Sequence, residues 1–83
     1  MNTVSIGGTA NANVQNQINI SIVFNFLKTH GPSYRAEIAR SLGLSAPAVS
    51  RAVEQLVEQG YLIESGTSRT ESGKKVTEIS LNA

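Results

Sequence analysis

The 83-residue sequence has no cysteine and no tryptophan, and it contains a single histidine. Without cysteine there can be no disulfide and no thiolate zinc site. One histidine and six scattered acidic residues leave little from which to build a metal site, so we expect neither a metal nor a cofactor. The serines have no histidine or acid at an activating spacing, and no glycine run has the context of a phosphate-binding loop. We therefore expect no enzyme.

Long apolar runs and a strong charge imbalance are also missing. No segment approaches the roughly 20 apolar residues that span a bilayer, and no charged-then-apolar leader opens the chain, so we expect a cytoplasmic protein without a membrane partner. The net charge is +1 at pH 7, so the positions of the basic residues must decide whether they bind phosphate. With 40% hydrophobic and 16% charged residues, the chain has the composition of one small globular domain.

Residues 1–12 show almost no apolar periodicity, and we interpret them as a flexible N-terminal arm. A long helix is predicted from Asn13 or Val14 to His30, because Asn13 can cap it and Gly31-Pro32 cannot continue it. On a helical wheel at about 100° per residue, its apolar residues cover roughly two thirds of the circumference. That is more apolar surface than one helix of so small a domain should need to bury. The excess would pack in a homodimer, or else against the N-terminal arm or a further domain.

A helix-turn-helix pattern follows. A short helix is expected over residues 35–42, and Gly43 ends it. Ser45 then caps a third helix, which carries Pro47 in its first turn and closes at Gly60. Two helices joined by a short turn that contains glycine are the helix-turn-helix signature, and the second of them suits the major groove of B-DNA.

After Gly60 the apolar period changes from near 3.6 to 2. Residues 61–64 and 76–81 are predicted to be strands, joined by a polar loop over residues 65–75. The predicted fold class is therefore α+β, mainly α. It is a winged helix-turn-helix domain over residues 13–83, with three helices followed by a two-stranded β-hairpin wing.

The candidate DNA-binding residues lie on three predicted elements. On the third helix, Ser50 can bond a phosphate or a base, and Arg51 can fork onto a guanine or a phosphate. Arg35 lies in the first turn of the short helix, where backbone N–H groups also favour a phosphate. Glutamates further along the third helix would repel phosphate, so we expect only its first two turns in the groove. The full set of candidates is Arg35, Ser45, Ala46, Pro47, Ser50, Arg51, Arg69, Lys74 and Lys75.

Four pieces of the sequence together carry a family resemblance: Gly31-Pro32, residues 35–45, Val49-Ser50-Arg51 and residues 56–62. They resemble the N-terminal DNA-binding domain of the ROK family of sugar-responsive repressors, which is similar to MarR-type winged helices. The resemblance covers about residues 18–82 and implies a repressor that binds double-stranded DNA. Members of that family also carry a sugar-kinase-like domain that binds the effector and dimerises. An effector sugar is therefore implied only if the full-length protein has such a domain.

Two positions depart from the family pattern. The family usually places a serine directly before the Arg-Ala-Glu run, forming a capping box, whereas Tyr34 stands there, which shifts the expected cap to Ser33. The family wing typically carries Gly-Gly-Arg-Pro, with its arginine offered to the minor groove. The matching stretch here is residues 72–75, Ser-Gly-Lys-Lys, which keeps the charge but lacks the planar fork of arginine.

These observations lead us to expect sequence-specific binding of double-stranded DNA by a transcriptional repressor. The alternative is a winged helix that serves as a protein-interaction module, supported by the near-neutral net charge and the broadly apolar first helix. DNA affinity that falls steeply with salt would favour the first hypothesis.

Overall fold

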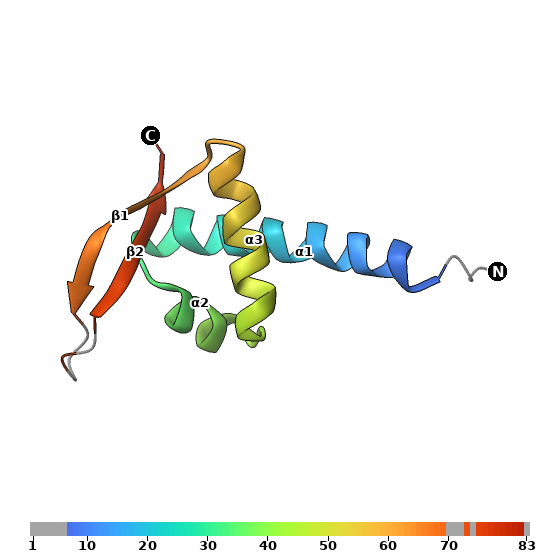
Figure 1. Cartoon of the computed structure of the whole chain (residues 1–83), viewed down its shortest axis with the longest axis horizontal. Helices are drawn as coiled ribbons and strands as arrows, with labels where there is room; N and C mark the ends of the chain where they lie inside the picture. The colour runs from blue at the N-terminus through green and yellow to red at the C-terminus, as the bar shows by residue number, and fades with distance from the viewer. Residues whose placement is uncertain (1–6, 70–72, 74, 83) are drawn as a thin grey trace.

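A computed structural model of the chain describes residues 7–69, 73 and 75–82. In this part of the chain the elements follow in the order α1 (Gly7–His30), α2 (Arg35–Leu42), α3 (Ala46–Glu58), β1 (Leu62–Arg69) and β2 (Lys75–Leu81) (Figure 1). The strands pair antiparallel to form a hairpin. This is the winged helix-turn-helix arrangement, and the predicted fold class is confirmed.

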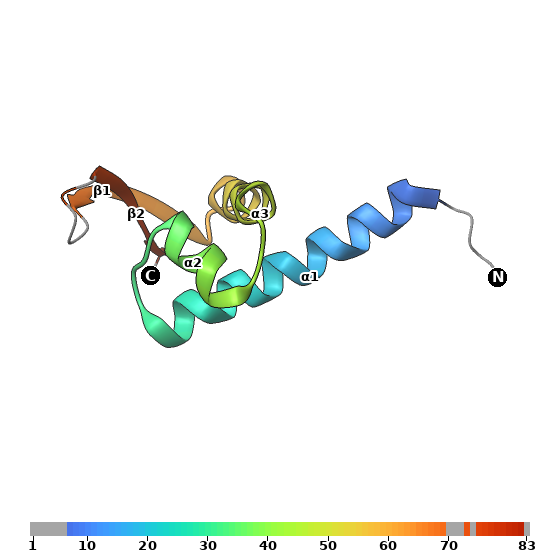
Figure 2. The same cartoon turned by 90° about the horizontal axis from the view of Figure 1, so that it is seen from below.

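The first helix, α1, crosses α3 and extends beyond the rest of the described molecule at its N-terminal end (Figures 1 and 2). It begins at Gly7, so the start predicted at residue 13 or 14 is wrong. Ala10 and Ala12, which precede the expected cap, have the highest helix propensity of all residues. The other half of the predicted arm, residues 1–6, lies outside the described residues, and its flexibility stays a prediction.

Only one stripe of α1 is buried inside the domain. Asn19, Val23 and Leu27 follow one another at intervals of four residues and are at most 6% exposed, as expected for one face of a helix. Val14 and Ile18 are 59% and 49% exposed. Although α1 has 24 residues, no helix within the described residues combines enough length and apolar character to cross a membrane.

The core lies where the helices meet the inner end of the hairpin. The hairpin contributes one buried side chain from each strand, and burying a Leu or Ile contributes about 1.5–3 kcal/mol. This anchors the inner end of the hairpin and leaves its outer end free to project from the helices. The buried apolar residues are Val23, Leu27, Ile38, Val49, Ala52, Val53, Leu56, Leu62 and Ile79.

The hairpin is longer than the sequence predicted. The strands continue to Arg69 and from Lys75, which pair with each other, so the prediction that both lie in a loop is wrong. A register shift between Ser65 and Thr67 leaves Gly66 outside the pairing, at φ +51°. Such a bulge bends a strand and lets pairing resume beyond it. The glycine therefore marks a bulge and not the end of the strand.

The turn between α2 and α3 has the geometry that the sequence predicted. Gly43 adopts a left-handed conformation with φ +70°, which favours glycine, and its N–H donates to the carbonyl of Ala39. The Ser45 hydroxyl accepts a hydrogen bond of 3.2 Å from the N–H of Ala48, and a proline follows in the first turn. These local caps fix where α2 ends and α3 begins.

We expect Ser45→Ala to lower the free energy of unfolding by about 1 kcal/mol, the typical cost of removing an N-cap side chain. Urea denaturation followed by circular dichroism measures the change. Ser41→Ala, at an exposed position of α2, is the control and should change the midpoint little. Equal effects of the two substitutions would show that the Ser45 hydroxyl does not stabilise α3.

Candidate nucleic-acid interface

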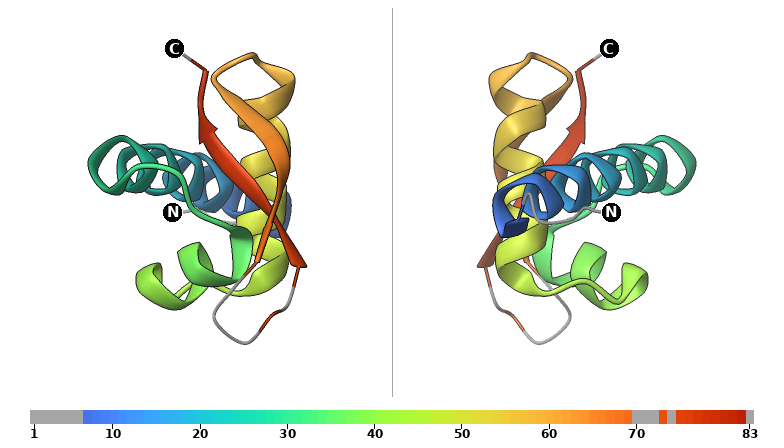
Figure 3. Two further views of the ribbon diagram at one scale, coloured as in Figure 1. Left: turned by 90° about the vertical axis from the view of Figure 1, so that its left-hand side faces the viewer. Right: turned by 90° about the vertical axis from the view of Figure 1, so that its right-hand side faces the viewer.

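The N-terminal end of α3 and the outer end of the hairpin lie on the same side of the molecule. Both are at the bottom in Figure 1, whereas the C-terminal ends of α3 and of the chain are at the top, and Figure 3 shows the same arrangement from two other sides. The chain reverses direction after α3 at Gly60, which has φ +85°. Because β1 then runs obliquely back toward the other end of the molecule, the outer end of the hairpin lies on the same side as the start of α3 (Figures 1 and 3).

The start of α3 presents small, accessible side chains on this side. The predicted residues Ser45, Ala46, Pro47 and Arg51 are exposed, and Ser50 is half-buried. The opposite face of α3 is fully buried in the core, which fixes how the helix presents this surface. Small residues permit close approach to a duplex, and an arginine on the second turn can reach a base edge or a phosphate.

The outer end of the hairpin carries two cations that face each other. Arg69 and Lys75 are opposite partners in the antiparallel register and both are exposed. Arg69 Nη1 donates to the carbonyl oxygen of Gly73 at 3.3 Å. Like charges directly opposite each other destabilise a hairpin, so this pair fits an anionic partner better than a structural role. The predicted Lys74 lies outside the described residues.

Arg35 makes a contact that the sequence did not predict. Its guanidinium Nη2 donates to the carboxylate Oε2 of Glu64 on β1, forming an ion pair. The two residues are 29 positions apart, so only the fold brings them together. The cation expected at a phosphate is therefore held by a carboxylate in the protein alone, and Glu64 is a residue that the sequence analysis missed.

The expected shift of the α2 cap to Ser33 is wrong. Tyr34 occupies the N-cap position and makes no side-chain capping bond. The Ser33 hydroxyl instead donates to Glu37 Oε1 at 2.7 Å. The backbone N–H of Ser33 donates to the carbonyl of Ile79 at 2.9 Å, and the N–H of Ile79 donates to the carbonyl of Ser33 at 2.7 Å. The bridge to β2 thus sets the position of Ser33 ahead of α2.

Acidic residues gather toward the C-terminal half of α3. Glu54 and Glu58 line a shallow pocket together with Val57 and Glu64, and all three carboxylates are exposed. A phosphate would be repelled there. This distribution fits the expectation that only the first turns of α3 approach nucleic acid.

Comparison with known proteins agrees with this architecture. A model of the MarR family matches residues 21–70, from the middle of α1 to just past the end of β1. The crystal structure of the Zalpha domain from Carassius auratus PKZ in complex with Z-DNA is similar, with a TM-score of 0.64 and 21% sequence identity over 81% of this chain and 97% of that one. At this identity the likeness shows the winged-helix fold alone. No curated protein sequence matches the chain.

Proposed function

Because this chain belongs to the MarR family, we propose that it binds double-stranded DNA sequence-specifically as a transcriptional repressor. The observation that carries the proposal is that the exposed start of α3 and the strand ends that carry the Arg69–Lys75 pair lie on the same side of the molecule. The first turns of α3 would enter the major groove, which is about 12 Å wide, and the hairpin would contact the flanking backbone. We propose a binding function and assign no catalytic role to any residue.

We further propose that the chain corresponds to the DNA-binding domain of a ROK-type repressor. The sequence segments over residues 31–62 support this finer relationship. An effector sugar belongs to the proposal only if the full-length protein has a sugar-kinase-like domain. Binding of DNA by the wing and α3 does not depend on that domain, so it can be tested on this chain.

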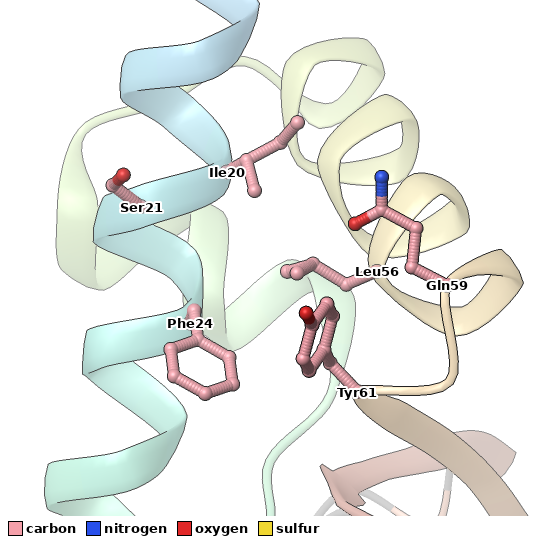
Figure 4. Close-up of a pocket in the computed structure, with 6 residues that line it drawn as sticks. All are labelled: Ile20, Ser21, Phe24, Leu56, Gln59 and Tyr61. Carbon is pink, nitrogen blue, oxygen red and sulfur yellow. The ribbon is translucent and has the colours of Figure 1, made fainter.

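A homodimer through α1 is also part of the proposal. Val14 and Ile18 are 59% and 49% exposed, and a shallow groove beside α1 is lined mostly by apolar side chains (Figure 4). The groove lies at the C-terminal end of α3, away from the end proposed to meet DNA, so a second copy there would leave the DNA-facing side free. Sedimentation that shows only a monomer at high micromolar concentration would remove this part. The groove residues are Ile20, Ser21, Phe24, Leu56, Gln59 and Tyr61.

The same groove favours the alternative function, a protein-interaction module. Within it the rings of Phe24 and Tyr61 meet edge to face, with centroids 6.0 Å apart, and Tyr61 is 54% exposed. An accessible aromatic pair of this kind is typical of a surface that binds another protein. Such a module would bind DNA weakly and with little salt dependence.

Selection from random double-stranded oligonucleotides at near-physiological salt, followed by sequencing, tests the proposal. An enriched motif would support specific DNA binding, and a palindromic motif would also support a dimer on the DNA. No enrichment, together with weak and salt-insensitive retention, would support the protein-interaction module instead. A brominated CG-repeat duplex in the Z form is a useful added probe, because the Zalpha neighbour is described in complex with Z-DNA.

We expect Lys75→Ala to weaken binding to selected and scrambled duplexes by the same factor and to reduce the salt slope by about one. A lysine at the outer end of the hairpin would neutralise a phosphate without reading a base. Fluorescence-anisotropy titrations over about 50–200 mM salt measure both quantities. Lys28→Ala removes the same charge from α1 and should have little effect. A loss confined to the selected duplex would contradict backbone binding by Lys75.

A further inference from the structure

The ion pair between Arg35 and Glu64 sets a carboxylate against the cation that was expected at a phosphate. The side chains are 31% and 40% exposed, so both water and a ligand can reach the pair. Exposed ion pairs contribute little to folding, since solvent screens the charges and two long side chains lose conformational freedom. Stability therefore gives no sufficient reason for placing Glu64 there.

The surroundings of the pair are acidic on the side of α3. Glu54 and Glu58 line the same shallow pocket as Glu64. On the other side, Arg35 lines a separate pocket with uncharged residues at the start of α2 and on β2. Three carboxylates would repel a phosphate that approaches Arg35, while Glu64 still holds the guanidinium.

We infer that Glu64 is a specificity-determining residue that suppresses non-specific binding of nucleic acid, an inference that rests on the DNA-binding function proposed above. Glu64 holds Arg35 both in the free protein and in the complex with the selected duplex, where α3 and the hairpin make the contacts to DNA. Non-specific binding is driven almost entirely by phosphate contacts. A loosely bound duplex gains little from Arg35, because it must displace Glu64 without the help of base contacts.

A duplex of the selected sequence binds in a different way. Base contacts at the start of α3 fix the register of the duplex, and its affinity comes from these contacts and from the hairpin, so it needs no phosphate at Arg35. The carboxylate therefore lowers non-specific affinity more than specific affinity. Specificity is a difference between affinities, and repulsion of the wrong partner raises it as effectively as attraction of the right one.

Glu64→Gln tests the inference, because it keeps the size of the side chain and removes its charge. We expect the affinity for a scrambled duplex to rise roughly three- to tenfold, the scale of one added phosphate contact. The salt slope for that duplex should steepen by about one. The affinity for the selected duplex should rise by less than about twofold, so the ratio between the two affinities falls. Anisotropy titrations at several salt concentrations measure all three, and thermal melting confirms that the variant is folded.

Glu54→Gln is the matched control, since it removes the same charge from the same pocket. The double variant R35A/E64Q tests whether the gain passes through Arg35, as a double-mutant cycle requires. An equal gain with Glu54→Gln, a gain that survives without Arg35, or an unchanged salt slope in Glu64→Gln would overturn the inference and leave the DNA-binding function intact. If the wild type and every variant retain DNA only weakly and without salt dependence, the proposed function fails, and the inference fails with it.

Discussion

Arg51→Ala should weaken binding to the selected duplex by about 1–3 kcal/mol, or roughly 5- to 150-fold, while binding to scrambled duplexes changes far less. Arg51 is exposed on the second turn of α3, and its neighbours Ala52 and Val53 are fully buried. The buried face fixes the rotation of the helix, so the guanidinium is presented to the groove from a rigid support. A bidentate contact to a guanine is the interaction that such an arginine makes best.

Two further variants separate base reading from charge. Arg51→Lys keeps the charge but loses the planar fork, so it should keep non-specific binding at the wild-type level and still show most of the loss in specific binding. Arg40→Ala removes an exposed arginine near the end of α2 and serves as the control, with little expected effect. Repeating the oligonucleotide selection with Arg51→Ala should relax the preference at one base-pair position. Unchanged binding by Arg51→Ala would show that the first turns of α3 do not read the DNA.

The elements that depend on local chemistry were predictable from the sequence. Gly43 and Ser45 fix the turn between α2 and α3 through a left-handed backbone conformation and a side-chain cap, and both act within a few residues. The start of α3 and its accessible face follow directly from this turn. The proposed recognition surface around Arg51 could therefore be located before the structure was known.

Contacts between distant segments were not predictable in the same way. The continuation of the strands past Gly66 depends on a bulge and on pairing across the hairpin with residues six to ten positions away. The ion pair of Arg35 with Glu64 spans 29 positions, and no local pattern marks it. The sequence showed that α1 has more apolar surface than the domain needs, but packing decided that the stripe through Val23 is buried while Val14 stays exposed.

The largest effect on stability is expected from Ile79→Ala, which should lower the free energy of unfolding by about 2–5 kcal/mol. The side chain of Ile79 is fully buried, and its backbone exchanges two hydrogen bonds with Ser33 in the segment before α2. This residue thus ties β2 to the helices at the point where the hairpin enters the core. Domains of this size are often stable by only about 5–15 kcal/mol, so a large part of the total would be lost.

Ile63→Ala provides the matched control, because it removes the same atoms from the partner strand of the hairpin at a position that is 41% exposed. We expect it to cost less than about 1 kcal/mol, since little apolar surface leaves the core and the cavity term is small. Urea denaturation gives both free energies of unfolding. The slope of each free energy against urea concentration reports how much surface becomes exposed on unfolding. A lower slope for Ile79→Ala would mean that the hairpin detaches before the helices unfold. Equal costs for the two substitutions would show that the hairpin is not anchored through Ile79, and the position of the Arg69–Lys75 pair on the same side of the molecule as the start of α3 would then lack its structural support.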